Sequence, residues 1–414
     1  MAYLTRRRAV AVFAAFAFTY LFAAVLRAVT ATLSPVLTDE FALQASDLGL
    51  LAGGYFLGFA AMQLPLGSWL DRQGPKKVIL ALLAVAVLGC LAFSWAQGLS
   101  SLLLARMLCG IGVSACLMAP LTGYRRWLEP QAQLRANSWM LMAGSLGMVA
   151  STLPVQWLLP VLGWRPLFWL VAGGIVLAMV VLALAVPRWD EGRPAGAAAA
   201  DTGGYREVWR HPYFRRMLPI GFVNYGGMIA IQALWAGPWM VQVQGRSPEQ
   251  SAAGLFWINV SMLCAFWLWG WINPALVRRG LHADRLIAWG LPLSFVVLAA
   301  IIGLGERAGA GWWAMFCVSS TFVSLAQPSV GMAFAAQFAG RALAGYNLVV
   351  FAGVFSVQWG IGLCIDAALW AGVARADAYR LAMAVFLVLG VASYGWFLLR
   401  PGDGNRDNAP ASRS

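Results

Sequence analysis

The sequence predicts an all-α membrane protein with twelve transmembrane helices in two groups of six. Hydrophobic residues make up 61% of the 414-residue chain, charged residues only 11%, and mean hydropathy is +0.72. A soluble domain of ordinary composition is far less apolar. Apolar segments long enough to cross a hydrocarbon core of about 30 Å recur along the whole chain. Lipid is therefore the expected solvent.

The first apolar segment follows Arg6, Arg7 and Arg8, as in a secretory signal. It continues to about residue 33, whereas the apolar part of a signal covers only about 7–15 residues, so we expect a membrane helix. The twelve predicted spans, in chain order, are 10–33, 48–70, 78–97, 100–122, 136–158, 165–186, 215–241, 252–272, 285–304, 311–336, 343–367 and 379–399.

The longest polar stretch separates the sixth predicted span from the seventh. It contains Pro194-Ala-Gly-Ala-Ala-Ala-Ala-Asp201, a low-complexity patch typical of a linker. Transporters are often built from two such paired halves. The predicted organisation is a six-helix bundle over 1–187, a linker over 188–214, a second bundle over 215–400 and a tail over 401–414.

The basic residues are distributed unevenly between the two sides of the membrane. Of the 29 Lys and Arg, twenty-two fall in or beside connections on the side of the N-terminus and five in connections on the other side. The positive-inside rule then places both termini in the cytoplasm of a multi-pass inner-membrane protein. The basic residues lie between apolar runs and do not form the aromatic-interleaved patch typical of nucleic-acid binding, so we expect no nucleic-acid partner.

All cysteines lie in apolar stretches without the paired spacing of a metal site. We expect small buried hydrophobic residues, with no disulfide, no metal, no cofactor and a monomeric chain. The six cysteines are Cys90, Cys109, Cys116, Cys264, Cys317 and Cys364.

The loop after the second span carries a specific motif. A glycine, an acid, a base, a second glycine and two further bases follow one another at fixed spacing, and this resembles the signature loop of the major facilitator superfamily. Its residues are Gly67, Asp71, Arg72, Gly74, Lys76 and Lys77.

The resemblance implies the major facilitator fold and a conformational gate at this loop. Gly67 would permit close helix packing, Gly74 a tight turn, and Asp71 would face the positive N-terminal end of another helix. Lys76 and Lys77 alone are equally consistent with simple topology signals.

Two further stretches resemble the same family. Arg106, followed by Gly110 and Gly112, is similar to its arginine-glycine pattern on helix four, in which the arginine lies inside the protein. Arg27, eight residues before Pro35, resembles the anion:cation symporter branch. An arginine there implies a bidentate clamp for a carboxylate, phosphate or sulfonate.

An arginine at membrane depth costs at least about 2.5–3.5 kcal/mol, so Arg27 is expected to face the protein interior or a wet cavity, with Tyr20 near its face. The alternatives are that Arg27 extends to the outer interface or pairs structurally with Asp366. Asp366 is the only carboxylate within the predicted spans. It is therefore a candidate for ion coupling, alongside a structural role at a loop edge.

Side-chain amides and tryptophans in the second half suit a polar cavity lined by aromatic residues. For each amide, packing between helices is as good an explanation as substrate contact. The candidates are Asn224, Gln232, Trp235 and Trp239, which form one stripe along the seventh predicted span, and Gln327, Asn347 and Gln358 on the tenth and eleventh.

These features favour a secondary transporter that moves a small organic anion by alternating access. Its partners would be the substrate, a co-transported ion and the lipid bilayer. Drug or metabolite export is the second interpretation, and a non-transporting sensor a third. A membrane enzyme would need clustered acids, histidines or cysteines at membrane depth, and the sequence has none.

Overall fold

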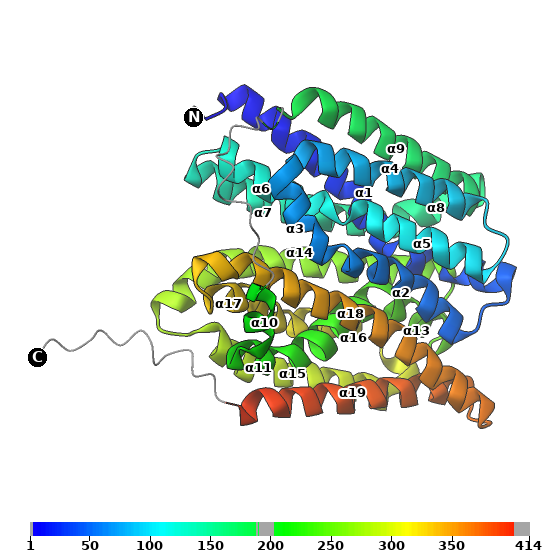
Figure 1. Cartoon of the computed structure of the whole chain (residues 1–414). Helices are drawn as coiled ribbons and strands as arrows, with labels where there is room; N and C mark the ends of the chain where they lie inside the picture. Colours follow the sequence, from blue (N-terminus) through cyan, green and yellow to red (C-terminus); the bar gives the residue numbers. More distant parts are fainter. Residues whose placement is uncertain (1–2, 188, 190–202, 401–414) are drawn as a thin grey trace, which may run out of the picture.

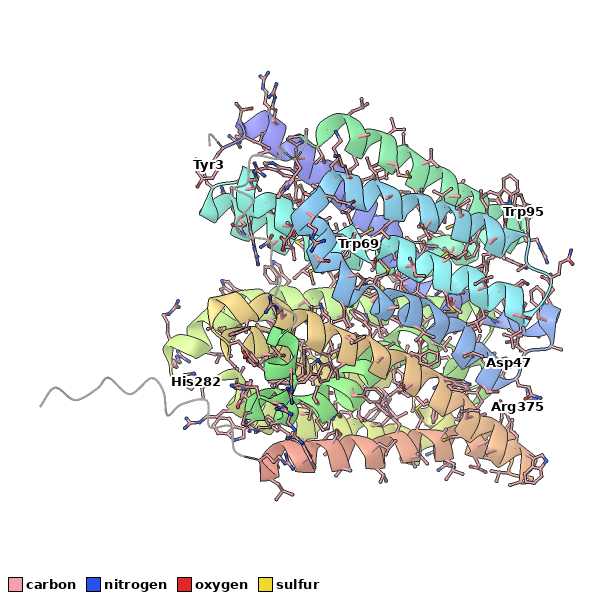
Figure 2. All side chains as sticks on the ribbon, in the orientation of Figure 1. Tyr3, Asp47, Trp69, Trp95, His282 and Arg375 are labelled. Atoms are coloured by element: carbon pink, nitrogen blue, oxygen red, sulfur yellow. The ribbon has the colours of Figure 1, made fainter. Side chains whose placement is uncertain are left out.

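The computed structural model describes residues 3–187, 189 and 203–400, and within these ranges the chain is helical without strands. Helices from the first and second halves of the chain form two neighbouring groups (Figure 1). The start of α1 and the end of α19 lie at the same end of the molecule, which we call the termini face. The opposite end, where Asp47 and Arg375 lie in Figure 2, is the far face.

The described part of the first half, residues 3–187, contains nine helices. They are α1 (Arg6–Phe41), α2 (Ala45–Ala61), α3 (Gln63–Gln73), α4 (Pro75–Ser94), α5 (Leu99–Val113), α6 (Ala115–Trp127), α7 (Pro130–Ala150), α8 (Leu153–Leu162) and α9 (Trp164–Ala185).

The second half begins with α10 (Gly203–Arg210) and α11 (Pro212–Pro219). The seventh predicted span starts in α11 and continues through the π-helix η1 (Ile220–Tyr225), α12 (Gly226–Ala230), the π-helix η2 (Ile231–Trp235) and α13 (Ala236–Gln242). The remaining elements are α14 (Pro248–Arg278), α15 (Ala283–Leu304), the 3₁₀ turn η3 (Gly305–Arg307), α16 (Ala310–Ser320), the 3₁₀ segment η4 (Thr321–Leu325), α17 (Ala326–Met332), α18 (Ala336–Trp370) and α19 (Arg375–Leu399).

Nine helical stretches of the described chain are long and apolar enough to cross a membrane, and eleven if each of two bent pairs is one span. One bent pair is α2 and α3, which meet at 45°. The remaining predicted span, 311–336, is present as α16, η4 and α17. The 3₁₀ segment interrupts it, so no single helix of the required length covers it.

Helix α1 is longer than predicted, because Pro35 does not end it. A proline inside a helix leaves the carbonyl of residue i−4 without its backbone donor. Here that carbonyl belongs to Ala31, and the Ser34 hydroxyl donates to it at 2.8 Å. The freed acceptor is thus satisfied locally, as an apolar surrounding requires, and the helix continues to Phe41.

Short side chains let the two halves approach closely at the far face. Helix α2 lies against α18, and a Cβ at Gly49 would collide with the Gln358 carbonyl, while one at Gly362 would collide with the backbone of Ala45. Further along α2, Phe59 packs on Phe351 with ring centroids 4.5 Å apart. The halves are therefore closed against each other on the far-face side of the molecule.

The predicted linker overlaps α10, and its low-complexity patch at 194–201 lies outside the described residues, as does the predicted tail at 401–414. Four cysteines are buried, as expected, whereas Cys264 is exposed and Cys364 half-buried. Among the described residues, no cluster of His, Cys, Asp or Glu could hold a metal ion.

Candidate functional site

Arg27 lies in the middle of α1, inside the protein. Its guanidinium is beside the hydroxyls of Tyr20 and Tyr55, and it keeps partial solvent exposure. Its Nε is buried and has no hydrogen-bond partner among the described residues. Neither alternative for Arg27 is seen, because the side chain faces tyrosines of α1 and α2 and makes no ion pair with Asp366 in the described structure.

Arg106 on α5 is fully buried and lies next to the same group. Its Nη1 donates to the Leu26 carbonyl at 2.7 Å, and its Cζ lies 5.1 Å from the centroid of the Tyr55 ring. Arg106, which matches the arginine-glycine pattern of the family, therefore faces the interior, as predicted. It holds α1 at the residue directly before Arg27, so Arg106 positions the segment that carries the candidate anion ligand.

Tyr55 connects the two arginines. Its ring packs against Arg106, a favourable cation–π arrangement, while its hydroxyl donates to the Ala23 carbonyl at 3.2 Å and lies beside Arg27. We call Arg27, Tyr20, Tyr55 and Arg106 the arginine cluster.

The arginine cluster carries positive charge without a compensating acid. The ion pairs seen in the described structure involve neither arginine. An embedded charge is normally paired or faces a polar cavity. Donor atoms without acceptors in a positively charged site are suited to an anion that binds from solution.

The second half of the chain also reaches this site. Tyr225 in η1 lies near both Arg27 and Tyr20, and Cys116 on α6 lies near Arg27. Tyr225 is half-buried, like Arg27. A ligand at Arg27 would thus contact both halves, as alternating access between the halves requires.

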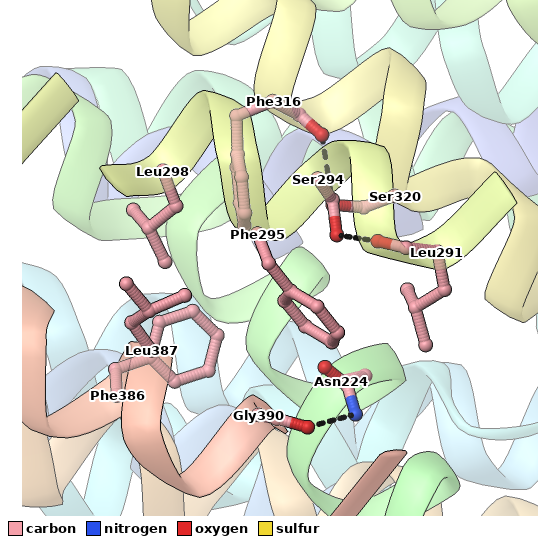
Figure 3. A pocket seen from close by; sticks show the side chains of 10 residues that line it. All are labelled: Asn224, Leu291, Ser294, Phe295, Leu298, Phe316, Ser320, Phe386, Leu387 and Gly390. Carbon is pink, nitrogen blue, oxygen red and sulfur yellow. Dashed lines mark hydrogen bonds between the residues drawn. The ribbon is translucent and has the colours of Figure 1, made fainter. Parts of the chain in front are cut away.

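Asn224 joins two helices in this conformation, which is the packing alternative stated above for each amide. Its Nδ2 donates to the Gly390 carbonyl at 3.3 Å and to the Ser393 hydroxyl on α19. Figure 3 shows Asn224 and Gly390 at one side of a small pocket whose wall includes Ser294 and Phe316.

The other predicted residues of the seventh span, which lie in η2 and α13, contact different helices. Gln232 Nε2 donates to Asn259 Oδ1 on α14 at 3.0 Å, and Trp235 Nε1 donates to the Gln358 carbonyl on α18 at 3.1 Å. Trp239 packs edge-on against Trp313 on α16, with centroids 5.4 Å apart.

The two π-helical segments explain this divergence. A stripe predicted at 3.6 residues per turn assumes a regular α-helix. Each π segment has a wider turn, so the residues after it face a different direction from the one predicted. Trp235 and Trp239 are fully buried, so in this conformation they serve the core of the second half.

The predicted amides of the tenth and eleventh spans, which lie in α17 and α18, divide into two cases. Gln327 donates to Asn347 Oδ1 at 2.6 Å, which joins α17 to α18. Both amide atoms of the Gln358 side chain are buried without a partner in the described structure. Gln358 therefore keeps unused hydrogen-bonding capacity, next to the close approach of α2.

In the signature loop, Gly74 directly precedes α4 with φ 77°, in the left-handed region that favours glycine, and a Cβ there would collide with Trp189. Lys76 Nζ donates to the carbonyls of Ala183 and Val186 at 2.6 and 2.7 Å. It thus caps the negative C-terminal end of α9, a structural role beyond a topology signal.

Gly67, Asp71 and Arg72 of the loop are exposed in this conformation. Asp71 and Arg72 are exposed, and neither has a hydrogen bond or ion pair within the described chain. A Cβ at Gly67 would meet no atom within 4 Å, so the expected close packing at Gly67 is wrong for this conformation. The latch predicted for Asp71 is not engaged here.

Asp366, near the C-terminal end of α18, lies at the far face. Its carboxylate accepts hydrogen bonds from the backbone amides of Ala45 and Ser46, at 3.1 and 2.7 Å. These amides belong to the first turn of α2, where the helix dipole favours an anion. Asp366 therefore clamps α18 to the start of α2, in addition to the glycine contacts.

The family model of the Major Facilitator Superfamily matches residues 16–365. The chain belongs to this superfamily. It is a secondary transporter with multiple membrane-spanning helices, and its family and fold are those of transporters.

Individual relatives agree with this family. The chain is 25% identical over 235 residues to a probable sulfoacetate transporter of Cupriavidus necator, a match that spans 53% of this chain and about half of the relative, 54%. It is 26% identical over 358 residues to a probable 4-methylmuconolactone transporter of Cupriavidus pinatubonensis, covering 80% of this chain and 79% of the relative.

The fold matches solved structures over nearly the whole chain. A bacterial homologue of the human lysosomal transporter Spinster, in an inward-facing and unoccupied conformation, superposes with a TM-score of 0.78 at 18% identity, covering 96% of this chain and 98% of that one. This confirms the predicted fold class.

Sequence reasoning missed Tyr55, Tyr225 and Cys116 as members of the site. Tyr55 lies in an otherwise apolar, glycine-rich segment, and nothing in its spacing relates it to Arg27. Only the packing of α2 between α1 and α5 brings its hydroxyl to one arginine and its ring to the other.

Proposed function

We propose that this transporter moves small organic anions, with Arg27 as the group that binds the carboxylate or sulfonate. The observation that carries the proposal is the arginine cluster, in which two embedded guanidinium groups share Tyr55 and have no acidic partner in the described structure. One relative, a probable sulfoacetate transporter of Cupriavidus necator, supports an anionic substrate.

The chemistry of the cluster favours an anion over a neutral or cationic solute. An arginine presents N–H donors in a planar fork that matches a carboxylate or sulfonate, and a charge-assisted bond is roughly twice as strong as a neutral one. The Tyr20 hydroxyl beside the guanidinium adds a donor for the remaining anion oxygens, and the Tyr55 hydroxyl would become a second donor if it exchanged its bond to the Ala23 carbonyl for the anion.

The proposed topology follows the charge distribution of the sequence. The termini face would lie in the cytoplasm of the inner membrane, with the bundles 1–187 and 215–400 joined by the linker 188–214. The two bundles would rock about the site at Arg27. The conformation described here is closed at the far face and would represent an inward-facing state.

Two carboxylates provide the gates in this scheme, Asp366 near the C-terminal end of α18 and Asp71 in α3. Asp366 would hold the far face closed through the start of α2, and Asp71 would latch the termini face when the site opens outward. Since Asp366 is engaged at the far face and not beside Arg27, we assign it to gating and leave ion coupling to a co-transported ion of unspecified type.

The proposal is tested by flux into proteoliposomes that contain the purified protein. Radiolabelled small carboxylates and sulfonates are compared with neutral and cationic compounds. Wild type should carry an anion, Arg27→Ala should not, and the control Arg307→Ala, an exposed arginine, should behave as wild type. Transport of only neutral or cationic compounds, unaffected by Arg27→Ala, would instead support export of drugs or metabolites.

A further inference from the structure

An apolar groove runs along the surface of the second half, away from the arginine cluster. Its walls are α14 and α15 and its floor is α16 and η4, and it has a volume of about 500 Å³. Leu268, Leu293 and Met315 on its rim are 45%, 54% and 53% exposed, so the groove opens outward from the bundle. In a membrane protein this surface faces the lipid.

The groove presents hydrocarbon almost exclusively, because its polar side chains are satisfied within the wall. Trp269 Nε1 donates to Thr321 Oγ1 at 2.8 Å, and the Thr321 hydroxyl donates to the Val318 carbonyl. The Ser319 hydroxyl donates to the Phe316 carbonyl. No polar group of the wall is left to attract water or a polar solute, so the interior suits an alkyl chain.

The length of the groove matches one leaflet. It extends along α15 from Leu286 to Val297 and along α14 from Leu276 to Ala265, which is twelve residues and eleven helical steps in each case. At a rise of about 1.5 Å per residue this is roughly 17 Å, close to half of a hydrocarbon core of about 30 Å. The groove therefore accommodates one acyl chain that enters from the termini face.

The mouth of the groove is strongly basic. The turn between α14 and α15 lies at the termini face, where His282 is labelled in Figure 2. Arg278 at the end of α14, Arg279 in the turn and Arg285 in the first turn of α15 are exposed, and along the chain each lies within three residues of the lining residue Leu276 or Leu286.

The one acid of this turn does not neutralise these arginines. Asp284 pairs with Arg216 and accepts a hydrogen bond from Tyr213 at 2.8 Å. Within the described structure, none of the three exposed arginines has an ion pair. A head group at the mouth would therefore meet uncompensated positive charge.

We propose that this groove is a binding site for an anionic phospholipid of the leaflet at the termini face. One acyl chain lies in the groove, and the phosphate contacts Arg278, Arg279 and Arg285. Charge complementarity selects an anionic head group over a zwitterionic one, because each basic residue near the surface adds to the attraction for anionic lipid. The lipid would stabilise the gap between α14 and α15 without touching the substrate site.

Native mass spectrometry of the full-length protein tests this site, with phosphatidylglycerol and phosphatidylcholine of identical acyl chains as probes. We expect one phosphatidylglycerol per chain to bind at least about tenfold more tightly than phosphatidylcholine. The variant R278Q/R279Q/R285Q should lose this preference, whereas R278K/R279K/R285K should keep it. The control R6Q/R7Q/R8Q removes the same charge elsewhere on the termini face and should also keep it.

A second variant tests the groove independently of the charges. Ala265→Trp fills the far end of the groove and should abolish tight phosphatidylglycerol binding with all three arginines in place, while thermal unfolding confirms that it folds. Equal affinity for the two lipids, preference retained in the glutamine variant, or equal loss in the R6Q/R7Q/R8Q control would overturn the proposal. Retention of the tight site by a folded Ala265→Trp protein would do the same.

Discussion

Tyr55 holds Arg106 over its ring, with 5.1 Å from the guanidinium carbon to the ring centroid, and places its hydroxyl beside Arg27. One side chain thereby couples a fully buried structural arginine to the half-buried arginine that we propose as the anion ligand. The phenolic hydroxyl and the aromatic ring have separable roles in this relationship, which leads to the first prediction.

Tyr55→Phe removes the hydroxyl and keeps the ring under Arg106. Loss of one hydrogen-bonding group next to the ligand should weaken anion binding by about threefold to tenfold, equivalent to roughly 0.5–1.5 kcal/mol, with little change in thermal stability. Titration calorimetry and thermal unfolding of the purified variant check this. Wild-type affinity in Tyr55→Phe would remove the hydroxyl from the proposed site.

Arg106→Gln should destabilise the protein and weaken anion binding together. The substitution removes a buried hydrogen bond from a charged donor to the Leu26 carbonyl, and a bond of this kind contributes about 1.5–3 kcal/mol. Because Leu26 precedes Arg27, the ligand should also lose its position. Thermal unfolding in detergent, followed by binding at a temperature where the variant is folded, separates the two effects. Unchanged stability would contradict the role of Arg106 as a positioning residue.

Gly49→Ala should shift the protein away from the conformation closed at the far face. Its Cβ would collide with the Gln358 carbonyl, so α2 and α18 could no longer pack at this point. Spin labels on the turn before α2 and the turn after α18, measured by double electron–electron resonance, should report a longer mean distance between the two turns. Gly360→Ala on α18 is the matched control, because a Cβ there meets no atom within 4 Å.

Asp366→Asn should weaken the same closed state through a different contact. A neutral amide accepts the Ala45 and Ser46 amide hydrogens less strongly than a carboxylate and loses the favourable interaction with the helix dipole, worth about 0.3–1 kcal/mol. The open population should rise by about twofold to fivefold in the same distance measurement. If the distances stay as in wild type, Asp366 is not a far-face latch.

Asp71→Asn should slow the transport cycle and leave membrane insertion and anion affinity intact. In the conformation described here Asp71 is exposed and unengaged, so its proposed latch acts only in the outward-facing state. Initial rates in proteoliposomes test this, with Asp39→Asn, another exposed acid, as the control. Equal rates for wild type and Asp71→Asn would count against the latch.

The fold class can be predicted from the sequence, and so can the position of Arg27 and Arg106 inside the protein, because both depend on properties of single segments. Long apolar runs and their basic connections predict the helices, and an embedded arginine is exceptional wherever it occurs. Helix α1 passed its predicted end because Ser34 satisfies the carbonyl that Pro35 frees, a local compensation that a proline rule does not include.

The composition of the site was harder to predict because it depends on helix rotation. Asn224, Gln232, Trp235 and Trp239 were assigned to one face, yet two π segments turn them toward four different helices. Tyr55 was missed because its partners lie on other helices. Asp366 was recognised as the one carboxylate in the spans, but its partner, the start of α2, follows only from the packing of the two halves.

The central claim is that Arg27 binds the anionic group of the substrate. Its most direct test is equilibrium binding of a library of small carboxylates and sulfonates to the purified protein, with Arg27→Ala and Arg27→Lys measured alongside. We predict that wild type binds at least one anion, that Arg27→Ala loses it, and that Arg27→Lys binds it much more weakly because lysine cannot form the two-point contact. Anion binding that survives in Arg27→Ala with unchanged affinity would contradict the claim.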